Sequence, residues 1–208
     1  MAIQSDPIRN VVFDPTDGVF IAQNSRPATL QDVNLGAINP FVRALLIIDG
    51  TVTKYIEAYT NEPVTVHLLE QTSHALCDDH QWLDAQRGAQ VVCRQSMLVG
   101  DQTGCLRAFA ESLIAVERLS PRMRQGLDSE PGGLGKILFD SGIETRREGL
   151  WFGREQLTEL PGPVGALCDG DFLARTYRVI AGGAPLMMIT ERFPYHDNFS
   201  TGILAAVD

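Results

Sequence analysis

The chain has 208 residues, of which 44% are hydrophobic and 21% charged, and its formal net charge is −9 at pH 7. This length and composition are typical of one globular domain with a substantial core, and the acidic balance argues against a nucleic-acid partner, whose phosphates require a basic surface. No stretch approaches the ~20 apolar residues of a membrane helix, and residues 1–14 lack the basic and apolar segments of a signal peptide. We therefore expect a cytoplasmic protein with no membrane partner.

An N-terminal extension over residues 1–37 precedes a predicted domain over residues 38–208. Within the extension, residues 11–13 and 19–21 are typical of two short strands joined by the Pro/Gly turn of residues 14–18. The extension contains no catalytic pattern. We expect it to form a hairpin that covers an edge of a sheet or lengthens the sheet.

Four helices are predicted from capping residues, from prolines at first helical positions and from glycines at helix ends. The clearest signal is Asn39-Pro40, where a capping side chain precedes a proline. Thr51 is placed to cap the second helix in the same way. The predicted helices cover residues 40–46, 52–59, 121–130 and 134–140.

Five strands are predicted from β-branched residues and alternating hydrophobicity. They cover residues 63–69, 89–99, 105–116, 172–180 and 186–193. Glycine-containing turns at residues 100–104 and 182–185 join the second strand to the third and the fourth to the fifth as hairpins. Hairpins interspersed with helices indicate an α+β domain with an antiparallel sheet.

General motifs give little support for a metal or nucleotide site. Gly132-Gly133-Leu134-Gly135-Lys136 is glycine-rich but lacks the spacing of a P-loop. His74, Cys77 and His80 are zinc ligands by type, but a closed zinc site needs four defined ligands, and the fourth is unassigned. A solvated helix over these residues is the favoured interpretation, and we expect neither a metal nor a cofactor.

Arg94, Glu111 and Glu191 stand out among the charged residues of otherwise apolar predicted strands. Such a residue often faces water on the open side of an antiparallel sheet. If it is buried, it must be paired or contact a ligand, because an isolated buried charge is very costly.

Several separated blocks between about residues 39 and 194 resemble the chorismate lyase-like family, in the branch with mycobacterial and cyanobacterial members. The matching blocks cover residues 40–46, 49–53, 57–59, 110–114, 143–145, 175–185 and 189–194. The resemblance implies a six-stranded antiparallel sheet with flanking helices, and a ligand pocket enclosed by helical flaps. It also implies a carbon–oxygen lyase that converts chorismate to 4-hydroxybenzoate and pyruvate without a cofactor.

The resemblance implies site residues as well. Arg94 matches the arginine that grips the ring carboxylate, and Glu191 matches the glutamate that interacts with the ring hydroxyl. Leu134 corresponds to an apolar flap residue, and Val52 to an apolar ring contact, with a spacing that differs by one residue.

One position departs from the family pattern. Glu111 stands where the bacterial ubiquinone-pathway enzyme carries an arginine that helps to bind an anionic ligand. This puts the second carboxylate contact in doubt, and Arg178 is the predicted substitute.

Two alternatives remain open. The first is a relative recruited to another small-molecule transformation in secondary metabolism. The second is a non-catalytic small-molecule-binding domain like those of bacterial transcription regulators, although residues 1–37 are too short and insufficiently basic for the helix-turn-helix module that such domains follow.

Overall fold

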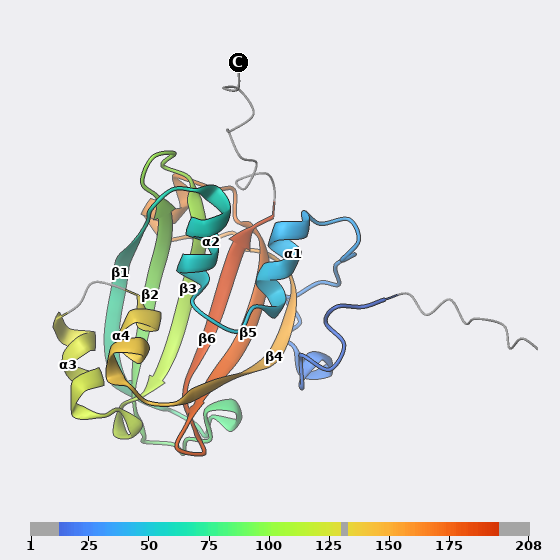
Figure 1. Ribbon diagram of the computed structural model, residues 1–208. Helices are drawn as coiled ribbons and strands as arrows, with labels where there is room; N and C mark the ends of the chain where they lie inside the picture. Colours follow the sequence, from blue (N-terminus) through green and yellow to red (C-terminus); the bar gives the residue numbers. More distant parts are fainter. Residues whose placement is uncertain (1–12, 130–132, 196–208) are drawn as a thin grey trace, which may run out of the picture.

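An antiparallel six-stranded sheet forms the centre of the computed structural model, which describes residues 13–129 and 133–195. The strand order is β1-β2-β3-β6-β5-β4, and helices α1 to α4 all lie over one face of the sheet (Figure 1). The strands are β1 (Val64–Ala75), β2 (Gln90–Gly100), β3 (Leu106–Ala115), β4 (Thr145–Gln156), β5 (Asp171–Ala181) and β6 (Ala184–Pro194). The helices are α1 (Pro40–Ile47), α2 (Val52–Thr60), α3 (Pro121–Ser129), α4 (Leu134–Ser141) and the short α5 (Gly162–Gly165). The 3-10 turns are η1 (Gln23–Ser25), η2 (Gln81–Leu83) and η3 (Val116–Arg118). The predicted α+β class and six-stranded antiparallel sheet are confirmed.

The two predicted hairpins are present and set the register of the sheet. β2 and β3 form one, and β5 and β6 the other. The second turns at Gly182 and Gly183, whose φ angles of 57° and 83° favour glycine. This turn places Arg175 of β5 directly opposite Glu191 of β6.

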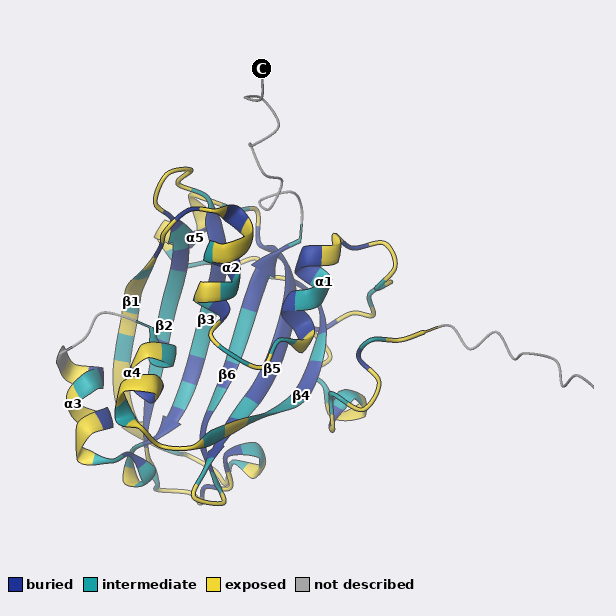
Figure 2. Cartoon of the chain, viewed as in Figure 1, coloured by how far each residue is buried: buried dark blue, intermediate teal, exposed yellow. Residues whose placement is uncertain are grey.

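Helices α1 to α4 form two apolar clusters with the sheet. α1 and α2 pack on one end of it through residues such as Leu45 and Ile56, both fully buried. α3 and α4 pack on the other end through residues such as Met123 and Ile137. In Figure 2 the strands are largely buried and the outer surfaces of the helices exposed. Space for a ligand on this face therefore lies between the two clusters.

The described part of the N-terminal extension covers the outer edge of β4. The Ile21 amide donates to the Gly149 carbonyl at 3.0 Å, and Gln31 and Arg154 exchange two backbone hydrogen bonds. At Gly149 a Cβ atom would lie 2.7 Å from the carbonyl oxygen of Val19, so only glycine allows this close approach. The predicted hairpin is not tested in full, because residues 11 and 12 lie outside the described residues. Of its second strand, only a single bridge between Phe20 and Gly149 is present.

Two local predictions were wrong. β4 was not predicted, because five charged residues interrupt its apolar pattern and a bulge between Gly149 and Trp151 breaks its alternation. The helix expected over residues 74–80 is absent, since β1 continues to Ala75 and pairs there with Gln90 of β2. Pairing along a neighbouring strand outweighs weak helical propensity in such a segment.

Within residues 13–129 and 133–195, every helix falls short of the length and hydrophobicity needed to cross a bilayer.

Candidate active site

A small cavity lies between the sheet and the first turns of α2 and α4. Its volume is about 70 Å³, and its floor includes Ser96 of β2, Ser112 of β3, and Ile189 and Glu191 of β6. The cavity has room for more than one water, whose share of liquid volume is about 30 Å³.

Two helix N-termini form the roof of the cavity. Thr51 is the N-cap of α2 and Gly133 that of α4; neither makes a side-chain capping hydrogen bond, and neither helix has an acidic residue in its first turn. Their first residues, Val52 and Leu134, line the cavity, where the resemblance predicted both. Free amide groups and the positive ends of the helix dipoles favour an anion beneath them. The roof therefore combines apolar side chains with a positive potential.

Glu191 is fixed at the cavity floor by two residues of the neighbouring strand β5. Its Oε2 accepts a hydrogen bond of 2.8 Å from Nε of Arg175, and its Oε1 accepts one of 3.1 Å from the hydroxyl of Tyr177. Arg175 also donates from Nη1 to the backbone carbonyls of Leu46 and Ile48, which lead from α1 to α2. Burial raises the pKa of Tyr177, and the charge of Glu191 raises it further, so the phenol remains a neutral donor. Glu191 is thus held in one orientation as a hydrogen-bond acceptor.

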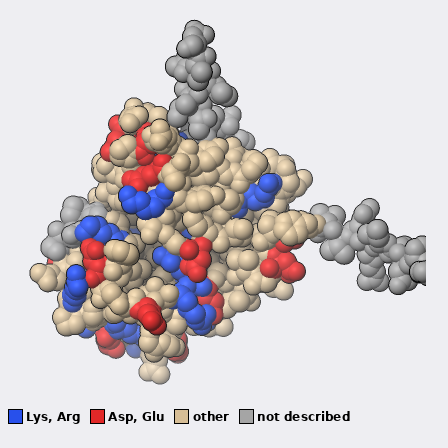
Figure 3. All heavy atoms as spheres, viewed as in Figure 1, with Lys and Arg blue, Asp and Glu red and all other residues tan. Residues whose placement is uncertain are grey.

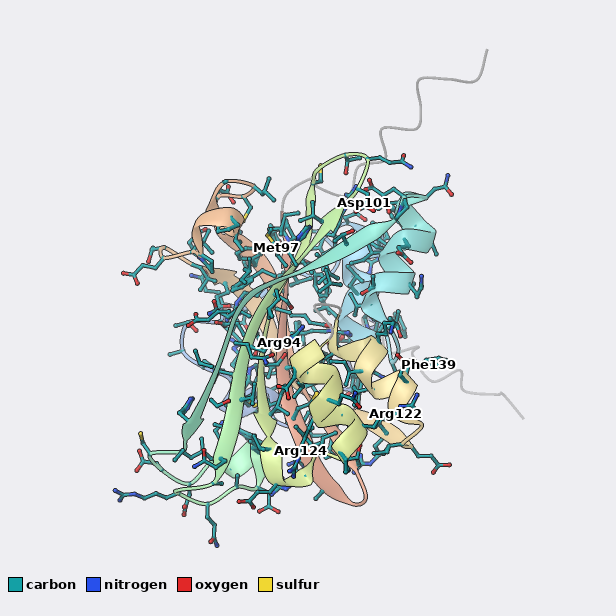
Figure 4. All side chains as sticks on the ribbon, turned by 90° about the vertical axis from the view of Figure 1, so that its left-hand side faces the viewer. Arg94, Met97, Asp101, Arg122, Arg124 and Phe139 are labelled. Carbon is teal, nitrogen blue, oxygen red and sulfur yellow. The ribbon has the colours of Figure 1, made fainter. Side chains whose placement is uncertain are left out.

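Arg94 lies at the margin of the cavity on the same face of the sheet. It pairs across strands with Ser112 and lies two residues from Ser96, and both serines line the cavity. Only 2% of Arg94 is exposed, and its Nη1 donates to Oε1 of Gln71 at 2.7 Å. In the side view of Figure 4, α1 to α4 lie on one side of the sheet and α5 on the other, with Arg94 labelled near α3. Burial lowers the pKa of Arg94, but a guanidinium starts so high that it stays charged at neutral pH.

The sequence also predicts that Arg94 and Glu191 face one enclosed pocket from neighbouring strands. The two residues share one face of the sheet, where Glu191 lines the cavity and Arg94 lies at its margin. Their strands are not neighbours, because β6 enters the sheet beside β3, which lies between β2 and β6.

The structure does not bring Glu111 and Arg178 to the cavity. Glu111 pairs with Gln95 and Thr190, one position out of step with the cavity residues, and so faces the opposite side of the sheet. There its carboxylate accepts hydrogen bonds from Gln95 and Arg192. Arg178 lies on that side too, where its Nε donates to Glu148 at 2.5 Å. The prediction that Glu111 and Arg178 contact a substrate in this cavity is therefore wrong. Successive residues of a strand point to opposite faces, and these two residues lie on the face away from the cavity.

Three cavity residues were missed from the sequence: Arg147, Arg175 and Tyr177. Arg175 and Tyr177 could have been found, since the Gly182-Gly183 turn places them opposite Glu191 and Ile189. Arg147 lies in β4, the strand that was not predicted. Arg147 and Tyr177 also line a second cavity of about 360 Å³ on the β4 side, between the extension and the residues that follow α1.

The possible zinc ligands His74, Cys77 and His80 do not assemble into a site. His80 instead accepts a hydrogen bond at Nδ1 from the backbone of Leu83 and caps η2. In the part of the chain that the structure describes, no three His, Cys, Asp or Glu side chains are grouped to hold a metal ion.

Comparison with solved structures relates the fold to bacterial regulators. The effector domain of PhnF from Mycobacterium smegmatis has a TM-score of 0.54 and 11% sequence identity, over 79% of this chain and 91% of that domain. A longer PhnF structure from the same organism has the same TM-score at 13% identity. The match covers 70% of this chain and 64% of that structure. At this identity the likeness concerns the fold alone.

Comparison of sequences gives a closer relationship. The chorismate pyruvate-lyase of Mycobacterium tuberculosis (strain CDC 1551 / Oshkosh) is 30% identical over 173 residues, which cover 79% of this chain and 84% of that protein. The chorismate pyruvate-lyase of Mycobacterium leprae (strain TN) is 28% identical over 171 residues, 79% of each chain. The family model described as chorismate pyruvate-lyase Rv2949c-like matches residues 46–199. The resemblance predicted from the sequence is confirmed, and the chain belongs to the chorismate pyruvate-lyase Rv2949c-like family.

Proposed function

We propose that this protein is a chorismate pyruvate-lyase that converts chorismate to 4-hydroxybenzoate and pyruvate. The observation that carries the proposal is the shared face of Arg94 and Glu191, a buried cation and an oriented carboxylate beside a cavity roofed by two helix N-termini. The family membership and the named mycobacterial relatives support the same reaction class.

The charge distribution around the cavity suits a dianion such as chorismate. The chain as a whole carries a net charge of −9, and Figure 3 shows basic and acidic side chains interspersed on the helix-covered face. At the cavity, Arg147 in the wall, Arg94 at the margin and the amide groups of α2 and α4 favour negative charge, while the carboxylate of Glu191 is paired with Arg175. A local positive potential of this kind attracts an anionic ligand against the overall field.

The reaction requires positioning more than reactive groups. The bond between the ring carbon and the ether oxygen breaks, enolpyruvate leaves, and the ring carbon that bears the hydroxyl group loses its proton. The ring becomes aromatic, which supplies the driving force, and enolpyruvate takes up a proton to become pyruvate. The protein must hold the carboxylates, orient the hydroxyl group and exclude water.

Each residue then has a role that its geometry allows. Arg94 binds the ring carboxylate through two parallel hydrogen bonds, for which a planar guanidinium is suited. Glu191 accepts a hydrogen bond from the ring hydroxyl and assists the loss of the neighbouring proton. Tyr177 and Arg175 keep Glu191 in place, while Val52 and Leu134 contact the ring from above.

The direct test is to incubate the purified protein with chorismate. We expect equimolar 4-hydroxybenzoate, identified by mass and retention, and pyruvate, measured with lactate dehydrogenase. Chorismate incubated without the protein corrects for the spontaneous breakdown of the substrate. Formation of neither product above that rate would refute the lyase assignment.

The likeness to the PhnF effector domain supports one second candidate, a domain that binds a small molecule without turning it over. Saturable binding of chorismate that leaves it intact would favour this candidate over the lyase.

A further inference from the structure

We propose that Arg147 binds the second carboxylate of the substrate, the one carried by the enolpyruvyl group. The inference rests on the proposed function, which gives the substrate two carboxylates, and it assigns the contact that Arg178 was predicted to make.

Arg147 is placed to contact a ligand. It pairs with Val179 of β5, two positions from Tyr177, and so faces the helix-covered side of the sheet. Of the residues that the structure describes, it is the one basic side chain in the wall of the smaller cavity. Its side chain is 19% exposed, and it also lines the larger cavity. A ligand that extends from one cavity toward the other must pass this guanidinium.

The hydrogen-bonding capacity of Arg147 is largely unused. Its Nε is buried and has no hydrogen-bond partner among the described residues. Its Nη1 lies 3.3 Å from Oδ1 of Asp49, whose side chain is 70% exposed. A guanidinium has five N–H groups, and a buried donor without a partner is costly. A carboxylate that enters the cavity would satisfy this donor.

The other arginines near the cavity are already committed. Arg175 donates to Glu191 and to two backbone carbonyls, and its Nη2, which also has no hydrogen-bond partner among the described residues, lies 2.8 Å from Oε2 of Glu191 in the same ion pair. Arg178 is paired with Glu148 on the opposite face, and the side chain of Arg146 is 65% exposed. These contacts leave Arg147 as the arginine that can act with Arg94.

Arg94 and Arg147 lie on the same face of the sheet, on strands near its two opposite sides. β2 and β4 are four strand spacings apart in the order β2-β3-β6-β5-β4, or about 19 Å between backbones. In chorismate one carboxylate is attached to the ring and the other to the ether side chain. With the ring carboxylate at Arg94 on the β2 side, the enolpyruvyl group points toward β4, where the 360 Å³ cavity gives it room.

The test compares ligands that differ in one carboxylate. 4-Hydroxybenzoate has only the ring carboxylate, whereas 3-(carboxymethoxy)benzoate carries a second one on an ether and cannot undergo the reaction. For Arg147→Gln we expect the dissociation constant of 3-(carboxymethoxy)benzoate, measured by calorimetry, to rise roughly 10- to 100-fold. The dissociation constant of 4-hydroxybenzoate should change by about twofold or less. KM for chorismate should rise by a factor similar to that for 3-(carboxymethoxy)benzoate.

Two matched variants separate a ligand contact from other roles. Arg146→Gln removes the same charge from the adjacent residue, which also borders the larger cavity but whose side chain is 65% exposed and paired with Glu148, and should leave both dissociation constants within about twofold. Asp49→Asn removes the ion-pair partner of Arg147, and should leave the affinity for 3-(carboxymethoxy)benzoate equal or higher, because Asp49 competes for the guanidinium.

The inference fails if Arg147→Gln binds 3-(carboxymethoxy)benzoate as the wild type does, or if the wild type does not bind it. It also fails if Arg146→Gln or Asp49→Asn produces the same loss, since the effect would then come from the general field or from the ion pair. These outcomes do not depend on turnover, so they are distinct from a failure of the lyase assignment, which the chorismate assay alone decides.

Discussion

The two faces of the sheet both carry buried or half-buried charges, but they use them differently. On the open face, the one that helices α1 to α4 do not cover, Arg192 of β6 donates to Glu111 of the adjacent strand β3 and to Glu155 of β4, two strands away, each at 2.6 Å, so that these charges neutralise one another. On the helix-covered face, Glu191 is held from β5 at the floor of a cavity, and Arg147 has a buried donor without a partner among the described residues. The ion pairs of Arg192 leave its guanidinium little hydrogen-bonding capacity for a ligand, whereas Arg147 keeps some. A charge inside a strand therefore indicates a site only where its face of the sheet meets a cavity.

The largest expected effect separates two glutamates that lie almost side by side in the sheet. Ala110 pairs with Glu191, and Glu111 with Thr190, so Glu111 and Glu191 lie one position apart on opposite faces. Glu191→Gln should lower kcat for chorismate by roughly 10²- to 10⁴-fold, because an amide assists neither the hydroxyl group nor the proton transfer as a carboxylate does. Glu111→Gln, with the same change of shape and charge, should leave kcat/KM within about twofold. Steady-state kinetics of both variants tests this.

Equal losses in the two variants would mean that the open face also takes part in catalysis. A normal kcat for Glu191→Gln would remove Glu191 from the mechanism.

A second pair of variants compares arginine with lysine on the two faces. Arg94→Lys keeps the charge but loses the planar two-point contact with a carboxylate, so kcat/KM should fall roughly 10- to 100-fold, as expected for a charge-assisted hydrogen bond of ~1.5–3 kcal/mol. Arg192→Lys cannot contact Glu111 and Glu155 in the same way, and should mainly lower the free energy of unfolding, by about 1–3 kcal/mol. Kinetics and denaturant unfolding of both variants would measure the two effects.

The result that counts against the comparison is a reversed pattern. If Arg94→Lys kept its efficiency and lost mainly stability, Arg94 would be a structural residue like Arg192.

The sequence predicted most of the sheet, because hairpins depend on local signals. The alternating apolar residues and the glycine turns identified five strands, and the register of β5 and β6 follows from the turn at Gly182-Gly183. The face on which a charge lies does not follow from such signals alone. Glu111 was assigned to the site because an arginine of a related enzyme matches its position, but the period of two along β3 turns it away from the cavity.

Arg147 differs from Arg175 and Tyr177, which the local hairpin turn could have placed. The position of Arg147 depends on pairing between segments that are distant in the chain, which no local pattern records. β4 pairs with β5 over its whole length, and its other edge is covered by the extension, so tertiary contacts rather than periodicity make it a strand. Arg147 enters the cavity wall only as a consequence of that pairing.

The smallest expected effect concerns a carboxylate of the open face and the pH dependence of stability. Burial raises the pKa of Glu148, but hydrogen bonds from Arg178 and Arg146 outweigh it and hold this pKa below its ordinary value. A carboxyl whose pKa is lowered on folding adds stability at pH values above its unfolded pKa, and that stability is lost as the pH falls through the folded pKa. Glu148→Gln should therefore lower the melting temperature at pH 7 by about 2 °C or less, as for a partly exposed ion pair. The difference in melting temperature from the wild type should vanish as the pH falls below the usual pKa range of a glutamate.

Glu144→Gln, at an exposed position just before β4, controls for the loss of one negative charge. Melting curves between pH 7 and pH 3 measure both variants, and a Glu148→Gln deficit that persists unchanged in acid would mean that its ion pairs do not stabilise the open face.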